Sequence, residues 1–75
     1  MIVFRLKSDA YLAFLTKEAG VIKCRELFTF FEGEEIKITN ADRPNDPPLF
    51  ASVRGTHYER DPDHKNKVIA CYVIE

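Results

Sequence analysis

Residues 21–39, VIKCRELFTFFEGEEIKIT, decide the fold that the sequence predicts. In the first part of this stretch the apolar side chains follow a period of two, which is typical of a half-buried strand. These side chains belong to Ile22, Cys24, Phe28 and Phe30. Glu32 and Gly33 have the composition of a turn, and residues 35–39 alternate again. The stretch therefore predicts a hairpin, in which a strand over 21–30 turns back into a strand over 35–39.

Glu26 interrupts the apolar side of the first predicted strand. An unpaired carboxylate there would cost several kcal/mol, so the residue must pair, become protonated or leave the interior. We expect a bulge or an edge position to place it outside. Burial of Glu26 beside an arginine or a lysine would instead favour a functional role.

Upstream of the predicted hairpin, the sequence predicts a strand and then a helix. Residues 2–6 alternate with a period of two, and residues 9–19 carry apolar side chains on one helical arc. Ser8 has the side chain of an N-cap, and Gly20 is a suitable C-terminal stop. We therefore expect one short helix over about 9–19, which packing must hold in place.

Downstream, two polar loops separate two further strands. Residues 40–48 contain three prolines among Asn and Asp, and residues 61–66 form the second loop. Residues 49–55 alternate and can extend to 60, while residues 68–75 are β-branched and aromatic. The chain is thus expected to be a single domain, 1–75, of the small β-rich α+β class. One N-terminal helix would lie on an antiparallel sheet or a small barrel of about five strands.

The composition fits one small domain and excludes several classes of protein. The 75 residues carry 11 basic and 12 acidic side chains, and 45% of them are hydrophobic. That hydrophobic share excludes a disordered tail, while the near-neutral charge excludes binding of nucleic acid by bulk attraction alone. No signal-peptide pattern or apolar run of membrane length is present, so we expect a cytoplasmic protein with no membrane contact.

Three segments resemble strands of the Src homology-3 barrels. FTFFEGEEIKI (28–38) is similar to the second strand and its turn, LFASVRG (49–55) to the middle strand, and ACYVIE (70–75) to the closing stretch. This resemblance covers about half of the chain and implies an SH3-like barrel. The family's Trp at the start of the middle strand is absent, and Ala70 replaces the closing proline. In that family the tryptophan and the proline form the walls of the groove that binds proline-rich peptides. Because both residues are missing here, the resemblance does not imply such a groove.

The side chains that carry catalysis or hold metals do not occur in a known spacing. Neither serine lies in a Gly-x-Ser-x-Gly elbow, and no Cys-x-x-Cys or His-x-x-x-His pair is present. The three glycines are too scattered for a phosphate-binding loop. We therefore expect no enzyme, no metal and no cofactor. Catalysis would require Cys24, Glu26, His57 and Cys71 to converge.

Cys24 and Cys71 both fall in predicted strands. We expect them to be small buried hydrophobic residues with free thiols. If their strands are neighbours, a disulfide between Cys24 and Cys71 is the alternative, and it would stabilise the fold by closing a long loop.

Interaction with another protein is the first function that the sequence favours. A noncatalytic module, such as an adaptor or an inhibitor, would bind a partner protein through amphipathic aromatic side chains and an acidic turn. The aromatic residues are Tyr11, Phe50, Tyr58 and Tyr72, and the acidic residues are Glu32, Glu34 and Glu35. A solvated hairpin tip is the alternative interpretation of the acidic residues.

Two other functions stay open. Single-stranded nucleic acid would bind to Arg54, Tyr58 and Arg60, which share one face if their strand alternates. A homo-oligomer would form if residues 68–74 were an edge strand that pairs with its copy.

Overall fold

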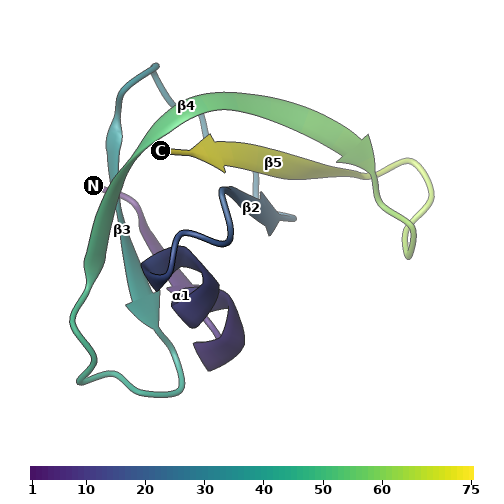
Figure 1. The fold of residues 1–75 in the computed structure, drawn as a ribbon. Helices are drawn as coiled ribbons and strands as arrows, with labels where there is room; N and C mark the ends of the chain where they lie inside the picture. Colours follow the sequence, from purple (N-terminus) through teal and green to yellow (C-terminus); the bar gives the residue numbers. More distant parts are fainter.

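The computed structural model describes residues 1–75 as one helix and five strands (Figure 1). The elements are β1 (Val3–Leu6), α1 (Ser8–Leu15), β2 (Val21–Cys24), β3 (Glu35–Asn40), β4 (Leu49–Arg60) and β5 (Val68–Ile74). The strands form one sheet in the order β1-β3-β4-β5-β2. The predicted class, a small β-rich α+β domain with one helix, is confirmed. No helix has the length and apolar character needed to cross a bilayer.

The 12-residue strand β4 bends and divides the sheet into two wings (Figure 1). Its first part pairs with β3, which pairs with β1, and its second part pairs with β5, which pairs with β2. The register shifts between Val53 and Gly55, and a bulge of this kind bends a strand. We call the β1-β3-β4 part the first wing and the β4-β5-β2 part the second wing.

Three expectations about the sheet need correction. β1 runs parallel to β3, so the sheet is mixed rather than antiparallel. β1 and β2 end the strand order and each pair on one side only, so the sheet does not close into a barrel, and the resemblance to Src homology-3 proteins stays a prediction. β5 lies between β4 and β2. Its backbone is therefore already paired on both sides, so the expectation that residues 68–74 form an edge strand is wrong, while formation of a homo-oligomer stays a prediction.

The predicted hairpin of residues 21–39 does not form, because β2 stops after four residues and pairs with β5 instead of β3. The Tyr72 hydroxyl accepts a hydrogen bond from the backbone N–H of Phe28 (2.7 Å) and donates one to the backbone carbonyl of Glu26 (3.0 Å). These bonds satisfy backbone groups that a longer β2 would use in the sheet. The segment between β2 and β3, residues 25–34, is therefore a loop that crosses from the second wing to the first. We call it the crossing loop.

The core lies between the two wings and α1. Its buried members are Phe4, Tyr11, Ile22, Ile36, Ile38, Val53, Ala70 and Tyr72. Two phenylalanines of the crossing loop pack against it, with the ring centroid of Phe28 5.8 Å from that of Phe4 and the ring centroid of Phe30 5.0 Å from that of Tyr72. The predicted inward direction of Phe28 and Phe30 is confirmed, although they belong to a loop.

Glu26 is exposed and lies two residues beyond the end of β2. β2 is an edge strand, so the chain can leave the sheet there without breaking a ladder on both sides. The expectation that an edge position keeps this carboxylate out of the core is confirmed.

The helix is shorter than predicted and has different ends. α1 spans Ser8–Leu15, and Lys17 adopts a left-handed conformation (φ 64°) just beyond it. A left-handed residue ends a helix, so the stop is Lys17 rather than Gly20. Ser8 is the first helical residue and not the N-cap. Its backbone N–H donates to the carboxylate of Asp42 (2.9 Å), which supplies the acceptor from another part of the chain.

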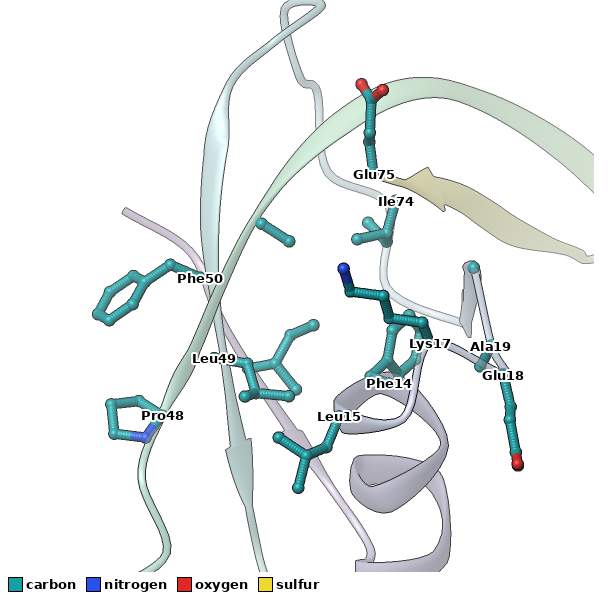
Figure 2. A pocket seen from close by; sticks show the side chains of 13 residues that line it. Phe14, Leu15, Lys17, Glu18, Ala19, Pro48, Leu49, Phe50, Ile74 and Glu75 are labelled. Atoms are coloured by element: carbon teal, nitrogen blue, oxygen red, sulfur yellow. The ribbon is translucent and has the colours of Figure 1, made fainter.

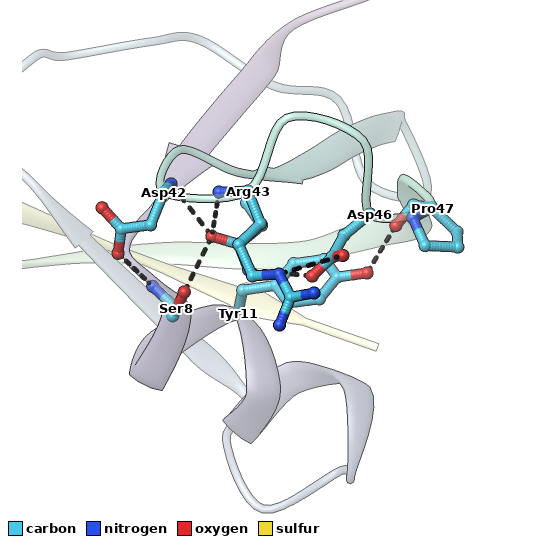
Figure 3. Close-up of polar contacts among 7 residues, drawn as sticks. Ser8, Tyr11, Asp42, Arg43, Asp46 and Pro47 are labelled. Atoms are coloured by element: carbon cyan, nitrogen blue, oxygen red, sulfur yellow. Dashed lines mark hydrogen bonds and ion pairs between the residues drawn. The ribbon is translucent and has the colours of Figure 1, made fainter.

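The buried side chain of Asn40 connects the end of β3 with the start of α1 through hydrogen bonds. Figure 3 shows these contacts around Ser8, Asp42 and Arg43. Its Oδ1 accepts hydrogen bonds from the Ser8 hydroxyl (3.2 Å) and from the backbone N–H groups of Asp42 (3.0 Å) and Arg43 (3.3 Å). Its Nδ2 donates to the Asp46 carboxylate (3.1 Å). An asparagine that bonds the backbone two and three residues ahead shapes a tight turn, so this one amide organises the polar loop that follows β3.

Asp61 is only 3% exposed, because Arg25 and the local backbone satisfy its carboxylate. The Arg25 Nε lies 2.7 Å from Asp61 Oδ2, and the backbone N–H of Asp63 donates to Oδ1 (2.9 Å). The bond from Arg25, followed by the bond from the Asp63 backbone, lowers the pKa of Asp61 from 3.8 to about 2. This ion pair joins the end of β2 to the turn between β4 and β5.

We expect Asp61→Asn to lower the urea midpoint of unfolding at neutral pH more than Asp63→Asn. Both carboxylates pair with Arg25, but only Asp61 is buried. Because its pKa is lower in the folded than in the unfolded state, ionised Asp61 stabilises the fold above about pH 4, and this contribution is lost as the pH falls towards 2. The difference in urea midpoint between wild type and Asp61→Asn should therefore shrink as the pH falls from about 4 towards 2. Equal neutral-pH midpoints for the two variants would contradict the prediction.

Candidate functional site

A groove of about 810 Å³ lies between the end of α1 and the first part of β4 (Figure 2). α1 contributes Phe14 and Leu15 to its lining, and β4 contributes Leu49 and Ala51, whereas the side chain of Phe50 points to the other face of β4. We call it the α1–β4 groove. Leu15 is 50% exposed, so a large apolar side chain of the groove faces solvent. A hollow apolar surface on a small domain is a feature typical of binding sites.

Lys17 is the charged side chain that is turned into this groove. Figure 2 shows Lys17 reaching across the groove towards Ile74, whereas the carboxylates of Glu18 and Glu75 point away from it. Glu75 pairs with Arg54, whose Nε lies 3.6 Å from its Oε2, and Lys17 has no ion-pair partner. The left-handed turn at Lys17 is also what positions this cation past the helix end. The groove thus combines an apolar lining with one free positive charge.

Of the four predicted aromatic contact residues, the structure leaves two available. Phe50 is exposed on the face of β4 that points away from the α1–β4 groove, and Tyr58 is exposed on the second wing. Tyr11 and Tyr72 are 2% and 0% exposed, so their assignment to a contact surface is wrong. Each hydroxyl has a partner inside the protein, since Tyr11 donates to the backbone carbonyl of Pro47 and Tyr72 bonds the crossing loop. A satisfied hydroxyl allows a tyrosine to be buried like a phenylalanine.

The predicted acidic residues surround the turn at Gly33, whose positive φ of 85° favours glycine. Glu32 and Glu35 are exposed and Glu34 is half-buried. None of the three forms an ion pair. Their role in steering a basic partner stays a prediction, and they lie outside the α1–β4 groove.

The predicted nucleic-acid face is only partly assembled. The bulge between Val53 and Gly55 changes the alternation, so Arg54 does not share a face with Tyr58 and Arg60. The prediction that all three residues face the same side is therefore wrong. Arg54 instead pairs with Glu75.

The alternative of a disulfide does not hold, because Cys24 and Cys71 both have free thiols, which was the main expectation. Their strands are neighbours, but Cys24 pairs with Ala70 and Cys71 with Lys23. Residues one apart along paired strands point to opposite faces of the sheet. The two thiols therefore lie on opposite sides of the second wing, and a bridge would need the backbone to move.

One combination of thiol, imidazole and carboxylate does occur in the fold. The donor atoms of His57, Glu59 and Cys71 all lie within 4.8 Å of one another, whereas Cys24 and Glu26 do not join them. None of the three lines the α1–β4 groove. Burial, followed by the nearby Glu59 carboxylate, raises the pKa of the Cys71 thiol, which disfavours the nucleophilic thiolate at neutral pH.

Sequence reasoning missed the lining residues Phe14, Leu15 and Leu49, and also Lys17, because it assigned their segments to the core or to the end of a helix. A signal was present in the helix. Its apolar arc is wide for so short an element, and a helix of eight residues buries only Tyr11 fully. The excess apolar surface is what lines the groove.

Comparison with known proteins adds no relative to these observations. No family model matches the sequence, and no curated protein or solved structure matches it significantly. The functional assignment therefore depends on the residues and their geometry.

Proposed function

We propose that this protein is a noncatalytic interaction module, such as an adaptor or an inhibitor. It binds a short segment of a partner protein in the α1–β4 groove. The observation that carries the proposal is the exposed apolar side chain of Leu15, which lies with Phe14 and Leu49 along a concave surface in a domain of only 75 residues. Exposed aromatic and aliphatic side chains in a hollow are the usual anchors of protein interfaces.

The charge of the groove defines the partner more closely. Lys17 is turned into an otherwise apolar lining and lacks an ion-pair partner. The complementary segment carries one acidic group, and apolar side chains that fit against Phe14, Leu15 and Leu49. Peptides selected from a displayed random library should share this pattern. Titrating them should shift the backbone amide resonances of the groove and leave those of the β4–β5 turn unchanged. Selected peptides without an acidic residue, or shifts confined to the turn, would contradict the proposal.

We expect Leu15→Ser to weaken the binding of a selected peptide by about 10-fold or more, the effect of losing one apolar anchor of an interface. Phe31→Ser is the matched control, because Phe31 is 79% exposed but does not line the groove. Isothermal titration calorimetry with both variants measures the two affinities. The same loss of affinity in both variants would show that Leu15 acts through general hydrophobicity and not through the groove.

Single-stranded nucleic acid is a second candidate ligand, at the turn between β4 and β5. Arg25 neutralises Asp61 and Asp63, and Lys23 pairs with Glu59 (3.1 Å). The cations that remain unpaired beside exposed Tyr58 are Arg60, Lys65 and Lys67. An aromatic ring beside cations is a stacking site for a base next to phosphates.

Fluorescence anisotropy with a labelled oligothymidine tests this second candidate. Binding should weaken steeply as salt rises, because phosphate contacts release counterions. Tyr58→Ala should weaken it and Arg54→Ala should not, since the bulge turns Arg54 away from the Tyr58 face. Absence of binding at low salt would remove the candidate.

A further inference from the structure

The outer face of the second wing carries three potential metal ligands in one row of side chains. His57 pairs directly with Cys71 across β4 and β5, so their side chains share a face. Glu59 lies two residues along β4 from His57, which places it on that same face. Sequence spacing hides this group, because Glu59 and Cys71 are 12 positions apart and only the strand register brings them together.

The donors match the chemistry of a borderline divalent cation. Zn²⁺ binds thiolate sulfur, imidazole nitrogen and carboxylate oxygen, and around a tetrahedral ion such donors lie about 3.4–3.6 Å from one another. The donors here all lie within 4.8 Å. Cys71 is fully buried, while His57 and Glu59 are exposed and free to rotate. Small movements of these two side chains would therefore bring the donors to coordinating distance of an ion that arrives from solvent.

Lys23 now occupies the place beside Glu59. Its Nζ lies 3.1 Å from Glu59 Oε2, and Lys23 pairs with Cys71 in the register of β2 and β5. The ion pair thus joins β2 to β4 across β5, over the strand that carries the thiol. A divalent cation would replace the lysine ammonium as the positive partner of the carboxylate, so the two cations compete for one position.

We propose that His57, Glu59 and Cys71 form a binding site for a zinc-class divalent cation, with Lys23 as the built-in competitor. Three protein ligands leave a fourth position for water. The site is separate from the α1–β4 groove, and its metal would link β4 to β5 and stabilise the second wing by binding the folded state.

Cobalt(II) titration of the reduced protein tests this site, because thiolate-bound cobalt gives a near-ultraviolet charge-transfer band and a tetrahedral visible spectrum. Wild type should bind one equivalent with both signatures, and Zn²⁺ should displace the cobalt. Cys71→Ser should lose the sulfur band, and Cys24→Ser, the matched control on the opposite face, should keep it. His57→Ala changes an exposed residue, so the variant should fold, and it should weaken binding at least about 10–100-fold.

Lys23→Met distinguishes this site from chance coordination at a surface. Removal of the competing ammonium should tighten cobalt binding several-fold, whereas a lysine without a role at the site would leave it unchanged. No cobalt binding by the wild type, a sulfur band that persists in Cys71→Ser, or unchanged affinity in Lys23→Met would each overturn the proposal.

Discussion

Tyr72→Ala should leave the protein largely unfolded at 25 °C. Replacing a large buried aromatic residue by alanine costs about 3–5 kcal/mol, and a core of this size rarely supplies more than about 3–5 kcal/mol in total. Tyr72 is fully buried, and its ring contacts those of Phe4, Phe28 and Phe30. Far-ultraviolet circular dichroism during urea unfolding measures the loss.

Tyr72→Phe separates the packing of the ring from the hydrogen bonds of the hydroxyl. The variant keeps the aromatic cluster but leaves the backbone N–H of Phe28 without its acceptor, which should cost about 1–3 kcal/mol. Hydrogen exchange at Phe28 should also become faster. If Tyr72→Phe were as stable as the wild type, the hydroxyl would not be what holds the crossing loop.

Asn40→Ala has the second largest expected effect. The change removes the acceptor for the backbone N–H groups of Asp42 and Arg43 and the donor to Asp46, with an expected loss of about 2–4 kcal/mol. Asn45→Ala is the matched control in the same loop. Its side chain is exposed and makes no hydrogen bond, so its effect should stay within about 0.5 kcal/mol. Similar losses of unfolding free energy in the two variants would contradict a specific role for Asn40.

Local features of the fold could be predicted from the sequence because they depend on periodicity. The alternation at Ile36 and Ile38 places both residues in the core, and the prolines after Asn40 lie in a loop as expected. Strand partners could not be predicted in this way, since alternation indicates a face and not a neighbour. The capture of the crossing loop by Tyr72 depends on a contact between residues more than 40 positions apart in sequence.

The candidate sites could be predicted only in part. Phe50 is exposed as expected but points away from the groove. Tyr11 and Tyr72 have an amphipathic character and are buried, because sequence does not reveal whether a hydroxyl finds an internal partner. Arg54 was misplaced because one bulge reverses every later residue of a strand. The position of Lys17 over the groove depends on where the helix ends, and the position of His57 beside Cys71 depends on the strand register. Periodicity in the sequence reveals neither of these features.

A charge exchange between Lys17 and a groove-selected peptide is the most direct measurement of groove recognition. Lys17→Glu alone, and replacement of the peptide's acidic residue by lysine alone, should each weaken binding about 10-fold, which corresponds to about 1.4 kcal/mol. When both changes are combined, the charges are opposite again and most of the affinity should return. If the loss of binding free energy for the combined changes equals the sum of the two single losses, the acidic group does not face Lys17. That result would contradict binding in the α1–β4 groove as described.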